Sequence, residues 1–134
     1  MHLAFYKGRT RLFDRLVQWT TGGPYSHCEL VMDGQCYSSS WRDGGVRVKT
    51  INLTSGHWDV VPVTGESADY AKAWFALHLG DGYDTAGLFG FVLPWRVHSR
   101  SRWFCSEACA EALGFAKSWQ ICPNELYRMR RAYA

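Results

Sequence analysis

The chain has 134 residues, of which 47% are apolar and 16% are aromatic. This composition excludes a disordered chain and supplies a core for one domain, while the length is too short for two ordinary domains. The formal net charge of +3 is weak and no nucleic-acid-binding motif occurs, so we exclude a nucleic-acid-binding protein. We expect a single domain over residues 1–134.

Five cysteines, an odd number, leave at least one thiol unpaired, and no Cys-x-x-Cys pair of a zinc ribbon occurs. We expect free thiols, including Cys28 and Cys36 across a hairpin, with no metal and no cofactor. No stretch approaches 18 apolar residues, and the segment Met1 to Tyr6 lacks the features of a signal peptide. We therefore predict no membrane insertion and synthesis in the cytoplasm.

The first elements of the chain are a strand and a helix. A short strand is predicted from Leu3 to Tyr6. Apolar residues then recur at spacings of three and four from Thr10 to Thr20, which predicts an amphipathic helix with Thr10 as its N-cap. The sequence Gly22-Gly23-Pro24 ends this helix.

The middle of the chain predicts an antiparallel sheet. The pair Asp33-Gly34 is typical of a tight hairpin turn between two strands. Pro62 places the last strand of this block at an edge or an end, because proline donates no backbone hydrogen bond. The predicted strands cover residues 27–32, 35–40, 46–53 and 58–63.

Helices dominate the remainder. They are predicted over residues 67–79, 84–91, 104–113 and 123–132. Gly80 and Gly114 follow two of them as C-terminal caps, and Pro123 opens the last one. The predicted fold class is α+β, with an antiparallel sheet packed against a cysteine-bearing helix and flanking helices.

One cysteine lies at a position where the ionised thiolate form is favoured. Cys105, in Trp103-Phe104-Cys105-Ser106-Glu107, begins a predicted helix, and peptide dipoles at a helix N-terminus stabilise a thiolate. The preceding segment carries several cationic side chains, which favour the same ionised form. The alternative is a buried structural thiol.

A histidine far upstream is the candidate base. His27 follows Tyr25-Ser26 at the start of a strand, where its imidazole can accept a proton from a thiol. The alternative is a structural or surface histidine. A base of this kind needs a partner that fixes its ring and tautomer.

The hairpin supplies several candidate partners for His27. Pairing through Asp33-Gly34 puts Ser40 opposite His27 and Ser38 opposite Glu29, whereas a bulge brings Ser39 to that face instead. Ser39, Ser38, Ser40 and Glu29 therefore all stay open as the orienting residue.

These motifs together resemble a known family. Tyr25-Ser26-His27 before a hairpin, with Phe104-Cys105-Ser106-Glu107 late in the chain, is similar to the circularly permuted branch of the NlpC-type papain-like cysteine hydrolases. That branch includes YiiX-like and YebB-like proteins and the lecithin:retinol acyltransferase relatives. In ordinary papain-like enzymes the cysteine helix precedes the histidine strand. In the permuted branch, as here, the order is reversed.

The resemblance implies roles for matching positions. Cys105 corresponds to the nucleophile and His27 to the general base, and Tyr25 and Trp103 are expected to line the substrate site. The family's third residue lies on the second strand, often as glutamate or histidine. This sequence has three serines there, of which Ser39 is the preferred candidate, and a serine cannot stabilise an imidazolium as a carboxylate does.

The expected activity is hydrolysis of an amide bond in a small peptide or acyl substrate, such as a cell-wall peptide reached by a phage or secretion-delivered route. Two alternatives are a lipid thioesterase or acyltransferase, favoured by an apolar groove of Trp95, Val97 and Trp103, and a non-catalytic binding or virion structural module. We also consider the basic residues Arg96, Arg100 and Arg102 as ligands for a carboxylate or phosphate of the substrate, or as solvated loop charges.

Overall fold

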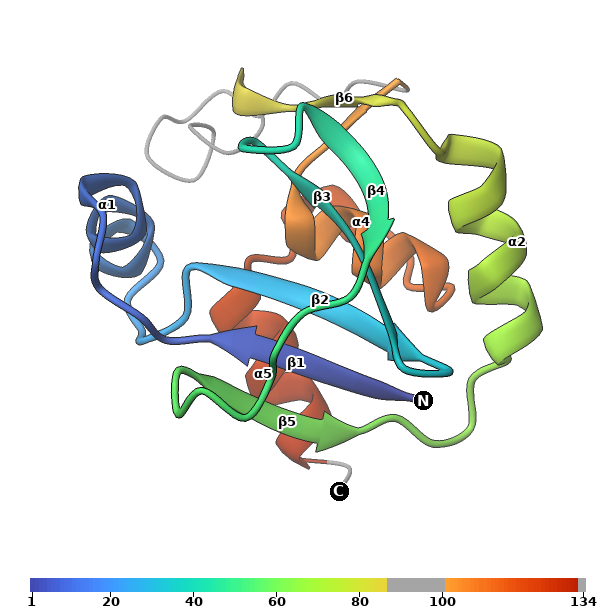
Figure 1. Cartoon of the computed structure of the whole chain (residues 1–134), viewed down its shortest axis with the longest axis horizontal. Coiled ribbons are helices and arrows are strands. Elements are labelled where there is room, and N and C mark those ends of the chain that lie inside the picture. The colour runs from blue at the N-terminus through green and yellow to red at the C-terminus, as the bar shows by residue number, and fades with distance from the viewer. Residues whose placement is uncertain (87–100, 133–134) are drawn as a thin grey trace.

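The computed structural model describes residues 1–86 and 101–132. Within them one sheet holds seven strands in the order β5-β1-β2-β3-β4-β6-β7. Figure 1 shows the strands crossing the centre of the molecule. The strands are β1 (His2–Tyr6), β2 (His27–Met32), β3 (Gln35–Ser40), β4 (Gly45–Lys49), β5 (Trp58–Pro62), β6 (Gly82–Tyr83) and β7 (Arg102–Trp103).

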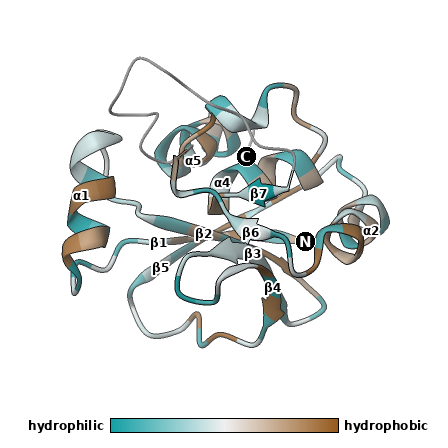
Figure 2. Cartoon of the chain, turned by 90° about the horizontal axis from the view of Figure 1, so that it is seen from above, coloured by the Kyte–Doolittle hydropathy of each residue, from teal (hydrophilic) through white to brown (hydrophobic). Residues whose placement is uncertain are grey.

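The helices surround this sheet. Figure 2 shows α4 and α5 on one side of it, with α1 and α2 beyond its two ends. The described helices are α1 (Leu12–Thr20), α2 (Ala68–His78), α4 (Cys105–Ala112), α5 (Pro123–Ala132) and the short 3-10 helix η1 (Ser118–Gln120). The predicted α+β class is confirmed: the strands pair antiparallel except β6 with β7, which run parallel.

The hairpin at the centre of the sheet follows the sequence closely. β2 and β3 have the predicted bounds, and Leu30 pairs with Tyr37 in the predicted register. Asp33 and Gly34 both have positive φ, at 48° and 74°, which is the backbone of the tight turn that matches strand twist. The strand around Pro62 is the edge strand β5, as predicted.

Three local predictions are wrong or incomplete. Helix α1 begins at Leu12 with Arg11 as its N-cap, so Thr10 does not cap it. β4 ends at Lys49 rather than at residue 53. The short strands β6 and β7 were not predicted, because two residues carry no period to detect. The helix predicted over residues 84–91 lies mostly outside the described residues.

The core lies between the sheet and α4. Leu3, Phe5, Cys28 and Leu30 point to this side, and each is 0% exposed. Small residues of α4, including Cys109, allow the helix to pack closely on β2 and β3. Among the described residues, no helix has the length and apolar character needed to cross a bilayer.

Helix α5 fixes the segment that leads into β2. The side chain of Asn124 accepts a hydrogen bond from the Tyr25 backbone N–H at 3.0 Å and donates one to the Tyr25 carbonyl at 3.0 Å. Ser26 N–H donates to the carbonyl of Tyr6. These bonds set the position of the next residue, His27, which begins the strand.

Candidate functional site

Cys105 is the first residue of α4, and its local structure is held at several points. Phe104 is the N-cap residue, and its backbone N–H donates to the Glu107 carboxyl group at 3.3 Å. The Ser106 hydroxyl donates to the carbonyl of Ile121 at 2.7 Å. Cys105 is only 1% exposed, so its sulfur lies in the core beside the sheet.

The pKa of the Cys105 thiol lies well below its ordinary value. The main cause is a hydrogen bond from the Cys28 side chain, which stabilises the thiolate, and the Cys28 backbone also contributes. Burial opposes ionisation, but the charge and hydrogen bond of His27 add to the stabilisation. These contacts favour the ionised form of the sulfur over its protonated form.

His27 interacts electrostatically with this sulfur. Its Nε2 lies 2.6 Å from Oε1 of Glu29. Burial disfavours the imidazolium, yet the negative charges of Cys105 and Glu29 outweigh it and raise the pKa of His27 to about 10. The His27 side chain keeps 22% of its surface exposed, so the imidazole is the accessible member of the pair.

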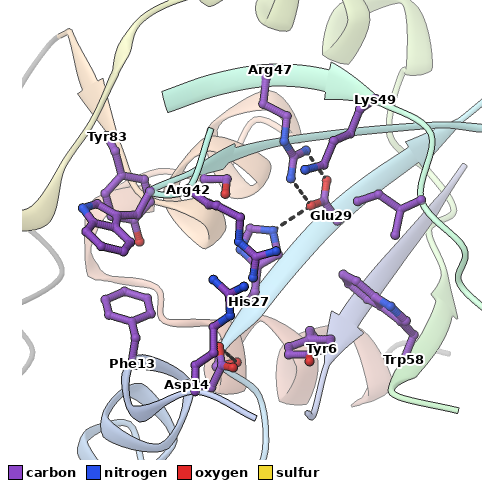
Figure 3. A pocket seen from close by; sticks show the side chains of 15 residues that line it. Tyr6, Phe13, Asp14, His27, Glu29, Arg42, Arg47, Lys49, Trp58 and Tyr83 are labelled. Carbon is purple, nitrogen blue, oxygen red and sulfur yellow. Dashed lines mark hydrogen bonds and ion pairs between the residues drawn. The ribbon is translucent and has the colours of Figure 1, made fainter. Parts of the chain in front are cut away.

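The Glu29 carboxylate is the negative group that contacts the His27 ring. It is 0% exposed and accepts two hydrogen bonds from the Arg47 guanidinium, one of them 2.6 Å long. Burial alone would raise the pKa of this carboxyl, but Arg47 and His27 lower it below its ordinary value. Figure 3 shows His27, Glu29 and Arg47 as one connected row, with contributions from β2 and β4.

The three serines on β3 serve other partners. Ser38 donates to the carbonyl of Cys28 at 2.7 Å, and Ser39 donates to the carbonyl of Trp103 at 2.6 Å. Ser40 lines a cavity. The structure therefore brings Glu29 to the His27 ring and directs the hydroxyl of the preferred candidate, Ser39, to β7.

A cavity of about 270 Å³ opens beside His27. Cys105 is not part of its wall, so the cavity reaches the pair from the imidazole side. Its wall is formed by side chains from α1, the sheet and the turn after β3, namely Tyr6, Arg11, Phe13, Asp14, Ser26, His27, Glu29, Ser40, Trp41, Arg42, Arg47, Lys49, Ile51, Trp58 and Tyr83.

The two aromatic residues predicted to line the site lie elsewhere. Tyr25 is 4% exposed, and its hydroxyl donates to Asp59 at 2.7 Å. Trp103 is 5% exposed and donates to Asp81 at 3.0 Å while packing against Trp74. Neither belongs to the wall of this cavity, because their large aromatic rings pack in the interior.

Of the remaining residues considered from sequence, only Arg102 and the cysteines lie in the part of the chain that the structure describes. Arg96, Arg100, Trp95 and Val97 lie outside the described residues, whereas Arg102 is exposed on β7. All five cysteines are free and buried thiols. In residues 1–86 and 101–132, no group of three or more His, Cys, Asp or Glu side chains is arranged to hold a metal ion.

Sequence reasoning missed Arg47, which neutralises Glu29, and the arginines of the cavity. One signal was available for Arg47. It pairs with Ser38 on the neighbouring strand, and Ser38 was already placed opposite Glu29. The hairpin register extended by one strand would thus have put a cation beside the buried carboxylate.

Comparisons with known proteins add no family name. A scan against protein-family models finds no match for this chain, and a search of curated proteins finds none with significant similarity.

Proposed function

We propose that this chain is a cysteine hydrolase with a circularly permuted papain-like arrangement, which cleaves an amide bond in a small peptide-type substrate. In this proposal Cys105 is the nucleophile, His27 is the proton donor and acceptor, and Glu29 orients the imidazole. The observation that carries it is the 2.6 Å contact between the buried Glu29 carboxylate and the His27 ring, on a strand whose next residue, Cys28, packs in the core with Cys105 at the start of α4.

The proposed reaction begins from the ion pair. The Cys105 thiolate attacks the carbonyl carbon, and a tetrahedral oxyanion forms that backbone N–H groups at the start of α4 can stabilise. The amine leaves as the C–N bond breaks, and the His27 imidazolium gives it a proton. Water then attacks the thioester while His27 accepts its proton, which releases the acid and restores the thiolate.

In this proposal Glu29 takes the role of orienting residue that the serines of β3 fill poorly. A carboxylate that contacts the imidazole stabilises its charged form and fixes one ring nitrogen, as a hydroxyl could not. Its position on β2, two residues after His27, replaces the second-strand residue that the resemblance implied. Arg47 keeps this carboxylate ionised despite its burial.

The test is the pH dependence of alkylation by iodoacetamide, a reagent small enough for a buried sulfur. We expect Cys105 to react at pH 6 at least about tenfold faster than a free thiol, because its thiolate is populated there. His27→Ala should move the midpoint of the profile upward. Cys105→Ala is the control for labelling at the other four cysteines, with the modified residue identified by mass spectrometry.

Two results would contradict the proposal. One is alkylation of Cys105 no faster than that of a free thiol at neutral pH. The other is a wild-type profile that His27→Ala leaves in place. Either result would favour the alternative of a non-catalytic module.

A further inference from the structure

We propose that the cavity beside His27 binds an anionic group of the substrate, a carboxylate or a phosphate, through Arg11 and Arg42. The inference deepens the proposed function and rests on it in one respect, namely that the anion belongs to the molecule on which Cys105 acts. The sequence pointed to other arginines, at positions 96, 100 and 102. The two residues of this proposal come from the start of α1 and the turn after β3.

The cations of the cavity fall into two kinds. Arg47 and Lys49 have carboxylate partners: Arg47 bonds to Glu29 and Asp43, and Lys49 bonds to Asp43 at 2.7 Å. Their charges are therefore matched within the protein. They position the site, but they have little attraction left for a ligand.

Arg11 and Arg42 differ from this pair. Both are exposed, and in the part of the chain that the structure describes neither has a carboxylate within ion-pair distance. Both line the same cavity as His27, and Figure 3 shows Arg42 extending into that space. Two such guanidinium groups on one cavity wall favour an anion.

The backbone around Arg11 supports the same ligand. Arg11 is the N-cap of α1, and no side chain caps this end of the helix. The backbone N–H groups of the first turn thus supply partial positive charge near the cavity wall, beside the guanidinium. These groups reinforce the two arginines, which carry the argument.

An aromatic stack lies next to the two arginines in the chain. Phe13 of α1 stacks on Trp41, with ring centroids 5.9 Å apart and planes 20° apart. Phe13 is two residues from Arg11, and Trp41 directly precedes Arg42. The stack joins the two segments that carry the arginines. Farther along the wall, Trp58 offers apolar surface for the remainder of a ligand.

One carboxylate in the cavity acts against an anion. Asp14 lines the wall and accepts a hydrogen bond from the Ser26 hydroxyl at 3.2 Å. Its charge offsets part of the attraction from the arginines. The substitution Asp14→Asn should therefore strengthen anion binding, whereas the arginine substitutions should weaken it.

The first experiment compares two alkylating reagents of nearly equal size, iodoacetate and iodoacetamide, which differ in charge. We expect the ratio of their rate constants at Cys105 to exceed the ratio for a free thiol. Arg11→Gln and Arg42→Gln should each lower this ratio roughly fivefold, and high salt should lower it in the wild type. Asp14→Asn should raise it.

The matched control is Arg15→Gln, since Arg15 is exposed on the same helix but lies outside the cavity wall. It should leave the ratio at the wild-type value. An unchanged ratio in both Arg11→Gln and Arg42→Gln, with rapid alkylation retained, would overturn the anion site and leave the proposed hydrolase standing.

A second experiment does not depend on the sulfur. The Cys105→Ala protein is titrated with N-acetylglycine, its uncharged amide, and glycerol 3-phosphate, with binding followed by calorimetry. We expect the carboxylate or the phosphate to bind at least about fivefold more tightly than the amide, and Arg42→Gln to remove the difference. The tighter of the two anions identifies the substrate class. Equal binding of all three probes would refute the proposal.

Discussion

The two sides of the sheet each bury a glutamate completely, with opposite consequences. Glu29, on the side of the cavity, has its pKa lowered by Arg47 and His27. Glu107, on α4, has its pKa raised to about 8, mainly by burial. Both side chains are 0% exposed. Burial by itself therefore does not determine the charge of these groups; the cations beside them do.

Successive side chains of β2 point to opposite sides of the sheet, and this separates the two environments. His27 and Glu29 belong to the side of the cavity, with its ion pairs, whereas Cys28 belongs to the core side, with the sulfurs of Cys105 and Cys109. His27, at the first position of the strand, interacts electrostatically with Glu29 on one side and with Cys105 on the other. The proposed chemistry thus combines a thiolate stabilised in a dry interior with a proton donor supported from a charged cavity.

The largest expected effect comes from removing the charge of Glu29. Glu29→Ala leaves Arg47, which is 13% exposed, without its main counter-ion, and we expect the free energy of unfolding to fall by about 3–5 kcal/mol. Chemical denaturation measures this. Asp43→Ala is the matched control, because it removes a more exposed partner of the same arginine and should cost under about 1 kcal/mol. Equal losses would contradict the expectation that the buried partner of Arg47 contributes more than the more exposed one.

Glu107 gives a prediction about how the stability of the protein depends on pH. Because the folded-state pKa of Glu107 is about 8, above the unfolded value of 4.5, the folded protein retains a proton that the unfolded chain has lost. Stability from this group is present at low pH and lost as the pH rises from 4.5 to about 8. Glu107→Gln should remove about 2–4 kcal/mol of that decline. Chemical denaturation of both proteins at pH 5 and pH 8 measures this difference. An equal change in the free energy of unfolding between the two pH values in both proteins would contradict the prediction.

The thiol contact can be tested through reactivity. Cys28→Ala removes the side-chain hydrogen bond to the Cys105 thiolate, so the pKa of Cys105 should rise and its alkylation at pH 6 should slow about tenfold. Cys109→Ala is the control in the same cluster, since Cys109 is not among the groups that lower the pKa of Cys105. If both substitutions slow the reaction equally, packing explains the effect better than the hydrogen bond.

The smallest expected effect concerns Ser39. Ser39→Ala loses the hydrogen bond to the Trp103 carbonyl, two residues before Cys105, and should cost about 1 kcal/mol of stability. The pH midpoint of Cys105 alkylation should stay in place, because Glu29 rather than Ser39 contacts His27. A shifted midpoint would return Ser39 to the role of orienting residue.

Much of the secondary structure was accessible from local patterns. The hairpin at Asp33-Gly34 and the helix from Pro123 to Ala132 have their predicted bounds because turn chemistry and caps act within a few residues. Helix α1 shows where this fails. Its apolar spacing suggested one buried stripe, yet Val17 is buried while Leu12 and Leu16 are 83% and 43% exposed. Periodicity identifies a helix but not which part of its apolar surface is covered.

The sequence by itself determined the α+β class and the hairpin, and it singled out the two residues of the proposed chemistry, His27 and Cys105, because these follow from local periodicity and motif. The tertiary structure decided that Glu29 contacts the imidazole, that Arg47 keeps it charged, and that Arg11 and Arg42 share a cavity. Such contacts join residues far apart in the chain. They depend on how strands and helices pack, which no local pattern specifies.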